Sequence, residues 1–197
     1  MVEKKLKWVD FYFDFISPYS YLAATQLEKF SESNPVEFEW APVNLPKLIK
    51  LSGNKPPGMI KNKALYSLRD LKRWADYLQV PFKMIRPGSF DSRPALRIAA
   101  GLDNADRQRF SMGVFEALWS GEIDPREEGW LERLFVLKGF STAWCQCAND
   151  SLNEDTESAL KAGAFGVPTF ILHGKGRPEL FFGIDHLDFL ARAIKKG

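Results

Sequence analysis

A serine stands where a buried strand is expected to give way to a helix. Ser17 and Pro18 follow an aromatic and β-branched run from Trp8 to Ile16, and apolar residues at helical spacing begin at Tyr19. The free N–H groups and the dipole of a helix start stabilise an anion by roughly 0.3–2 kcal/mol and lower thiol pKa values. No G-x-S-x-G motif supplies Ser17 with a base. Ser17 therefore either caps a helix or donates its hydroxyl to a thiolate that another molecule brings.

Two further positions allow a structural and a functional interpretation. Val167-Pro168 enters a β-rich run, so Pro168 can be an ordinary strand-edge proline. A cis bond there would instead expose the backbone of Val167 to an extended, peptide-like ligand. Asp185 precedes the last helical pattern and is a good N-cap, but its carboxylate could also pair with the ammonium group of a ligand.

The chain is poor in reactive side chains. Its two cysteines and two histidines exclude a disulfide-stapled scaffold, a zinc finger and a multi-histidine metal site, so no metal ligand is predicted. Cys145 and Cys147 lack the spacing of a redox dithiol, and a disulfide across one residue would be strained. We interpret both as structural or incidental, and a thiol oxidoreductase that uses both cysteines is the alternative, which activity surviving their replacement would exclude. His173 and His186 are interpreted as surface or supporting residues.

The composition is that of an ordinary globular protein. The 197 residues are 45% hydrophobic and carry a net charge of +2, with no basic block longer than the cluster of Lys4, Lys5 and Lys7. This argues against a nucleic-acid groove. Asp10 and Asp14 interrupt the apolar stretch that could be mistaken for a signal peptide, and no apolar run is long enough to cross a membrane. We expect a cytoplasmic enzyme or binding protein.

The hydrophobic periodicity predicts a mixed α/β fold with a helical middle. A strand over 8–16, a helix from Pro18 to Asn34 and a strand over 36–40 make a β-α-β opening. Helical patterns without a convincing strand fill 44–150, at 65–78, 96–100, 110–118 and 130–137, after a rigid polar loop at 52–58. A helix over 154–162, strands over 169–172 and 180–182, and a helix over 187–194 close the chain. The predicted units are one formed by 1–43 and 151–197, and a helical insertion at 44–150.

Several segments together carry a family resemblance. FYFDFISPYSYLA (11–23) resembles the first strand and active-site helix of DsbA-like thioredoxin-fold oxidoreductases, with Ser17-Pro18-Tyr19-Ser20 where those proteins have Cys-Pro-x-Cys. Replacement of both cysteines by serine is similar to the 2-hydroxychromene-2-carboxylate isomerases and kappa-class glutathione transferases. SGNKPPG (52–58), LYSLRDLKRWA (65–75), FGVPTF (165–170) and FFGIDHL (181–187) look like the same branch. The resemblance implies a thioredoxin-like, DsbA-like mixed sheet with a large all-helical insertion.

The resemblance also implies a glutathione site. Ser17, in the motif with Pro18 and Tyr19, would hydrogen-bond the sulfur. Val167, before a cis Pro168, would pair its backbone with the cysteinyl unit as an added strand. Further contacts would come from Asp185 to the γ-glutamyl ammonium group, from the backbone of Ile184, and from Asn54 and Lys61 closing over the tripeptide.

A second substrate would lie between the two units. Asp91, Ser92 and Arg93 resemble a segment in which the isomerases usually carry Asn at the position of Asp91. An acid there would repel a substrate carboxylate unless Arg93 or Arg97 offsets it. His186 stands where the family often has Arg.

The leading hypothesis is a glutathione-dependent isomerase of aromatic compound degradation that works by reversible thiolate addition. Its partner would be a small aromatic or electrophilic molecule, and the relatives suggest a homodimer. One alternative is a kappa-class transferase or peroxidase. Another is a non-catalytic thioredoxin-fold binding protein.

Overall fold

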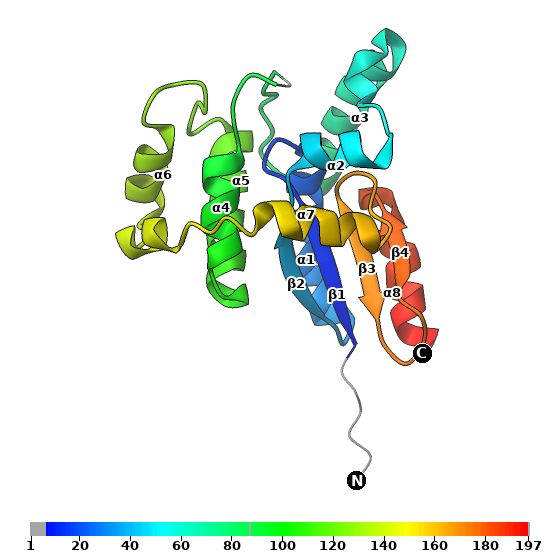
Figure 1. Cartoon of the computed structure of the whole chain (residues 1–197). Coiled ribbons are helices and arrows are strands. Elements are labelled where there is room, and N and C mark those ends of the chain that lie inside the picture. Colours follow the sequence, from blue (N-terminus) through cyan, green and yellow to red (C-terminus); the bar gives the residue numbers. More distant parts are fainter. Residues whose placement is uncertain (1–6, 87, 197) are drawn as a thin grey trace.

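A computed structural model describes residues 7–86 and 88–196, so Lys4 and Lys5 of the basic cluster lie outside the described residues. A four-stranded sheet in the order β2-β1-β3-β4 forms its centre (Figure 1). The strands are β1 (Trp8–Phe13), β2 (Glu37–Pro42), β3 (Thr169–His173) and β4 (Glu179–Phe182). The helices are α1 (Pro18–Ser33), α2 (Leu45–Ser52), α3 (Lys61–Leu78), α4 (Arg93–Gly101), α5 (Asn104–Ser120), α6 (Trp130–Lys138), α7 (Leu152–Lys161) and α8 (Leu187–Lys196). Short 3-10 turns are η1 (Pro57–Met59), η2 (Thr142–Cys147) and η3 (Ile184–His186).

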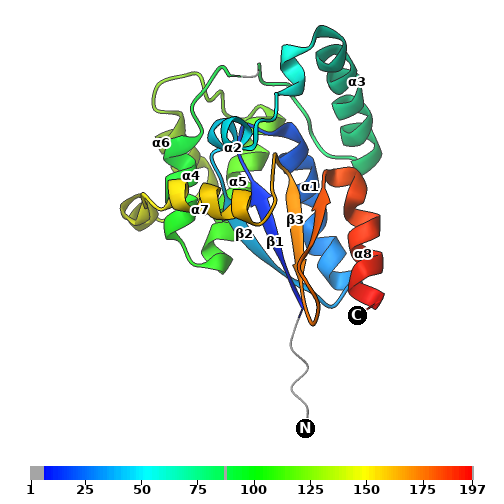
Figure 2. The ribbon, with the colours of Figure 1, turned by 45° about the vertical axis from the view of Figure 1, so that its right-hand side comes forward.

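The sheet is mixed, as predicted. β1 runs parallel to β2 and antiparallel to β3, and β3 runs antiparallel to β4. The helical connection α1 can return the chain to a parallel neighbour, whereas the short turn after β3 can only produce an antiparallel hairpin. Helices α1 and α8 cover one face of the sheet, and α2 and α7 lie on the other (Figures 1 and 2).

The first strand is shorter than predicted. β1 ends at Phe13 rather than Ile16, because Asp14 turns the chain. Its carboxylate accepts the N–H of Ile16 at 3.1 Å and its carbonyl accepts the N–H of Ser17 at 3.0 Å. This turn redirects the chain from the sheet into α1.

The helical middle is confirmed within the described parts of 44–150, which contain no strand. Gly121 and Gly139 end α5 and α6 in the left-handed conformation, which glycine adopts at little cost. Helix α2, of eight residues with Leu48 as its one buried residue, is not among the predicted helices. Such a short pattern carries too few apolar positions to be read from spacing alone.

One hydrophobic cluster extends from the sheet into the helical middle. Phe13 packs against Phe115 of α5 with ring centroids 5.6 Å apart. A smaller cluster on the other face joins Tyr12 and Ile171 of the sheet to Leu48 of α2 and Ala159 of α7. The larger cluster contains residues of both predicted units, so it draws no boundary between them. The division into 1–43 with 151–197 and 44–150 stays a prediction.

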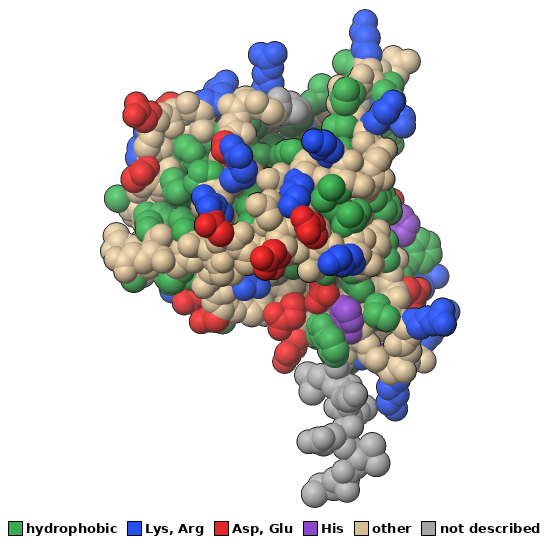
Figure 3. All heavy atoms as spheres, in the orientation of Figure 1, with side chains coloured by type: hydrophobic (Ala, Val, Ile, Leu, Met, Phe, Trp, Pro, Cys, Tyr) green, Lys and Arg blue, Asp and Glu red, His purple; other side chains and the backbone are tan. Residues whose placement is uncertain are grey.

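The face shown in Figure 3 carries both basic and acidic side chains, with hydrophobic ones between them. No helix of the described chain is both long and apolar enough to span a bilayer.

Candidate functional site

The carboxyl end of β1 lies at the edge of the sheet where β3 begins and β2 and β4 end. Phe13 pairs with Pro42, Tyr12 with Thr169, and Thr169 with Phe182. The residues that follow or precede these positions therefore emerge at one edge. This brings together Ser17, the Val167-Pro168 pair and the Ile184-Asp185 pair, which the sequence separates by up to 168 positions.

Ser17 is the N-cap of α1, which confirms the first of its two interpretations. The residue is 5% exposed, and its Oγ accepts the N–H of Ser20 at 3.1 Å. Pro18 occupies the first helical position, where a missing N–H costs nothing. Within the described ranges the hydroxyl of Ser17 donates to no acceptor. Its proton is thus available to an external acceptor at the positive end of a helix.

Tyr19 connects α1 to the long helix α3. Its hydroxyl donates to Asp70 at 2.9 Å, and burial together with Asp70 raises the pKa of Tyr19. Lys61, the first residue of α3, is exposed.

Val167 offers an unpaired backbone at the start of β3. The Val167–Pro168 peptide bond is cis, as the resemblance implies. Neither the N–H nor the C=O of Val167 bonds to another backbone group among the residues described. The next carbonyl, of Pro168, accepts the N–H of Gly183 at 2.9 Å. An extended ligand could therefore pair with Val167 without displacing a bond of the sheet.

Asp185 does not cap the last helix, which corrects the structural interpretation of this residue. It lies inside η3, whose N-cap is Gly183 with no side-chain capping bond. Gly183 has φ 93°, a conformation that favours glycine, and it turns the chain so that Asp185 faces outward with 65% of its side chain exposed. The ring nitrogen Nδ1 of His186 lies 3.4 Å from the Asp185 carboxylate. Ile184 is buried beneath them.

The polar loop at 52–58 approaches the same edge. The side-chain amide of Asn54 donates to the carbonyl of Phe165 at 3.0 Å, and Ser52 donates to the same carbonyl at 3.5 Å. Phe165 is two residues before Val167, so this loop lies beside the unpaired backbone.

The predicted substrate segment divides between surface and interior. Arg93 holds Asp91 through a bidentate ion pair with a shortest distance of 2.6 Å, which lowers the pKa of Asp91. Arg93 therefore offsets the negative charge that an acid at position 91 would present to a substrate carboxylate. Arg97 pairs with Asp150 instead. Ser92 is 4% exposed, and its hydroxyl donates inward to Asp14 at 2.7 Å.

Asp14 is a feature that the sequence reasoning missed. It is fully buried, and its carboxylate accepts bonds from Ile16, Leu45 and Ser92. Burial raises the pKa of Asp14 to about 6, against the lowering effect of these hydrogen bonds. The available signal is an acid inside an aromatic run, three residues before Ser17.

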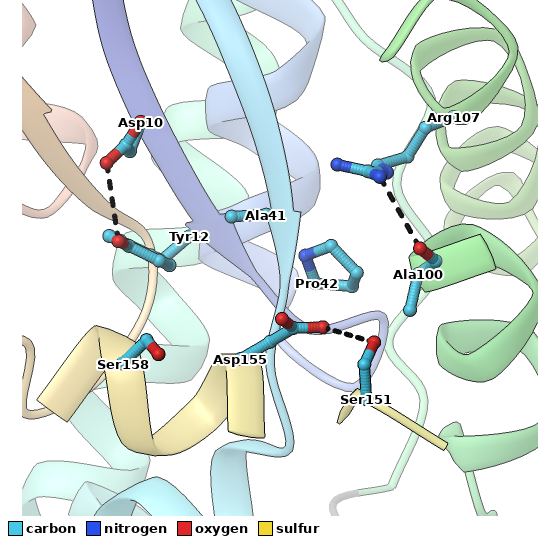
Figure 4. A pocket seen from close by; sticks show the side chains of 9 residues that line it. All are labelled: Asp10, Tyr12, Ala41, Pro42, Ala100, Arg107, Ser151, Asp155 and Ser158. Carbon is cyan, nitrogen blue, oxygen red and sulfur yellow. Dashed lines mark hydrogen bonds between the residues drawn. The ribbon is translucent and has the colours of Figure 1, made fainter. Parts of the chain in front are cut away.

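A cavity of about 250 Å³ lies between the sheet and α7, lined on the sheet side by residues of β1 and β2 such as Tyr12 and Pro42 (Figure 4). Its charged groups already have partners: Asp155 accepts from Ser151, Asp10 accepts from Tyr12, and Arg107 donates to carbonyls that include Trp40 and Leu102. We interpret these contacts as structural.

A wider groove of about 850 Å³ runs along α4 and is lined by Asp91, Arg93 and Cys145 among others. Cys145 and Cys147 are free thiols. Among the described residues, no group of three or more His, Cys, Asp or Glu side chains could hold a metal ion.

The chain resembles known proteins over nearly its whole length. The DSBA-like thioredoxin domain family matches residues 8–195. The chain is 31% identical to 2-hydroxychromene-2-carboxylate isomerase of Sphingobium xenophagum, covering 93% of this chain and 96% of that protein. It is 28% identical to glutathione S-transferase kappa 1 of Homo sapiens, covering 94% and 90%. A solved structure of 2-hydroxychromene-2-carboxylate isomerase superposes with a TM-score of 0.80 at 27% identity, over 96% of this chain and 95% of that one. The chain belongs to the DsbA-like thioredoxin family, in the branch of the 2-hydroxychromene-2-carboxylate isomerases and kappa-class glutathione transferases.

Proposed function

We propose that this protein is a glutathione-dependent isomerase that acts on an unsaturated aromatic-pathway acid, in the manner of a 2-hydroxychromene-2-carboxylate isomerase. One observation carries the proposal: the Ser17 hydroxyl caps a helix of 16 residues and keeps its proton free. This is a site for an anion that the chain itself does not supply.

The residues at the sheet edge fit the chemistry of glutathione. A cysteinyl backbone would find the N–H and C=O of Val167, and a γ-glutamyl ammonium group would find the exposed carboxylate of Asp185. Ile184 would contribute backbone groups beside Asp185. Asn54 and Lys61, on the loop and helix above the edge, would close over the tripeptide.

Bound glutathione would supply a thiolate that adds reversibly to a conjugated carbon, so that the former double bond can rotate before the thiolate leaves. Ser17 would donate its hydroxyl to the sulfur, and the N-terminus of α1 would favour the anion. Asp91 and Arg93 would offer a neutral ion pair, rather than a bare carboxylate, to an acidic substrate.

A kappa-class transferase or peroxidase is the second candidate. It is supported by the human kappa-class relative and by the 52–58 loop that joins the site through Asn54. A transferase would consume glutathione, whereas an isomerase regenerates it.

A spectroscopic assay of chromene-carboxylate isomerisation, with and without glutathione, tests the proposal. Isomerisation that requires glutathione and leaves its concentration unchanged is the expected result. Consumption of glutathione with an electrophile would favour the transferase. Tight binding without turnover would favour the non-catalytic binder. The homodimer and the cytoplasmic location stay predictions.

A further inference from the structure

The buried carboxylate of Asp14 connects three segments that meet around Ser17. It accepts the N–H of Ile16 at 3.1 Å, the N–H of Leu45 at 2.8 Å and the hydroxyl of Ser92 at 2.7 Å. These donors belong to the turn before α1, to the first residue of α2 and to the residue before α4. One side chain therefore holds the starts of three helices.

The same turn is held at two further points. The carbonyl of Asp14 accepts the N–H of Ser17 at 3.0 Å, and the indole N–H of Trp119 donates to the carbonyl of Phe15 at 3.1 Å. Buried hydrogen bonds of this kind restrict a turn because each unpaired group would bear its full desolvation cost. The orientation of Ser17 thus depends on contacts from the helical middle of the chain.

We propose that Asp14 is the positioning residue of Ser17: its carboxylate fixes the 14–17 turn and fastens the starts of α2 and α4 to it. Asp14 has no exposed surface, so it acts through Ser17 rather than on a ligand. Only the statement that Ser17 faces a sulfur rests on the proposed function. The hydrogen bonds from Asp14 to the three segments are present in the protein without a ligand.

Asp14→Asn is the sharpest substitution because it keeps the shape and removes acceptors. A carboxylate accepts hydrogen bonds with both of its oxygens, whereas a side-chain amide accepts with its oxygen and donates with its nitrogen. In either orientation the amide nitrogen would face a donor, the N–H of Leu45 or that of Ile16. Asp10→Asn is the matched control. It makes the same change four residues earlier, within β1, but Asp10 contacts His173 and Tyr12 instead.

The first experiment measures amide hydrogen exchange of the free protein. Asp14→Asn should speed exchange roughly tenfold or more in peptides covering 14–18, 43–47 and 91–94, while the centre of α5 keeps its wild-type rate. Asp10→Asn should leave these three peptides unchanged. Uniformly faster exchange, or unchanged exchange at the three peptides, would overturn the proposal. If Asp14→Asn does not fold, Ser92→Ala removes a single bond and should speed exchange at 14–18 and 91–94.

The second experiment measures the pKa of bound glutathione from its ultraviolet thiolate absorbance. Asp14→Asn should raise this pKa by about one unit. The same substitution in a Ser17→Ala background should add nothing, because the positioned group is gone. If Asp14→Asn raised the pKa of bound glutathione by the same amount with and without Ser17, the proposal would be overturned. If wild type binds no glutathione, the proposed function fails, and the exchange experiment alone decides the position of Asp14.

Discussion

The side-chain amide of Asn54 donates a hydrogen bond of 3.0 Å to the carbonyl of Phe165, across 111 positions of the chain. This contact joins the polar loop after α2 to the segment that presents the backbone of Val167. A loop so placed can cover a ligand bound at the sheet edge without any change in the sheet.

Asn54→Ala should weaken glutathione binding because it releases this loop. One neutral hydrogen bond of about 1 kcal/mol corresponds to a roughly fivefold rise in KM for glutathione, with little change in kcat. Steady-state kinetics at varied glutathione would measure it. Asn62→Ala, at an exposed position of α3, should leave KM unchanged. An unaltered KM in Asn54→Ala would show that the loop takes no part.

Ser17→Ala should raise the thiol pKa of bound glutathione and slow turnover. A hydrogen bond to a charged group is worth about 1.5–3 kcal/mol, which is roughly one to two pKa units. The acid limb of the pH–rate profile should therefore move to higher pH. Ser20→Ala is the control, since the buried Ser20 hydroxyl has no hydrogen-bond partner in the described structure. A Ser17→Ala profile that matches wild type would remove Ser17 from the mechanism.

Asp185→Asn should raise KM for glutathione and leave kcat almost unchanged. The exposed carboxylate contributes binding rather than chemistry, and screening limits the effect to a roughly three- to tenfold change. Cysteinylglycine, which lacks the γ-glutamyl unit, should bind both proteins equally. Asp188→Asn makes the same charge change three residues later on an exposed position of α8 and should change neither constant. An equal loss of affinity for glutathione and for cysteinylglycine in Asp185→Asn would contradict the pairing of Asp185 with the γ-glutamyl ammonium group.

Asp14 should make the protein more stable in mild acid than at neutral pH. Its pKa is raised by burial from 3.8 to about 6, with a further rise from the charge of Asp91. Between these values the folded chain binds more protons than the unfolded chain, so the contribution is present below 3.8 and is lost as the pH rises through about 6. The total is on the order of 3 kcal/mol.

Urea unfolding of wild type and Asp14→Asn measures this effect. The difference in unfolding free energy, wild type minus variant, should be larger at about pH 4 than at about pH 7. A difference that does not change with pH would mean that the pKa of Asp14 is close to that of an exposed aspartate.

Gly101→Ala should destabilise the contact between α4 and η2. A Cβ at Gly101 would collide with the backbone carbonyl of Cys147. Backbone cannot yield as a flexible side chain does, so we expect a loss of about 1–3 kcal/mol in urea unfolding. Gly58→Ala, where a Cβ would meet nothing within 4 Å, should stay within about 0.5 kcal/mol of wild type. Equal stability of the two variants would indicate that η2 does not pack on α4.

Much of the fold follows from the sequence because it depends on neighbours along the chain. The spacing of apolar residues predicts α1, α3 and α5, and Gly121 and Gly139 end helices by a conformation that glycine adopts at little cost. Ser17 as a helix cap is equally local, since its partner is the N–H of Ser20 three residues away.

The candidate site could be assembled from the sequence only through its resemblance to a family. Asp185 illustrates the limit: local rules favoured an N-cap, but Gly183 turns the chain so that the carboxylate points outward. Ser92 illustrates it again, because the resemblance placed it in a substrate segment, whereas its hydroxyl is buried against Asp14.

The sequence by itself determined most of the order of strands and helices, but not α2, and it determined the serine that caps α1. Only the tertiary structure decided what surrounds that serine. The partners of the Asp14 carboxylate include Leu45 and Ser92, which lie 31 and 78 positions away. A buried charge is bonded by whichever donors the packing of distant helices brings to it, and no local pattern records them.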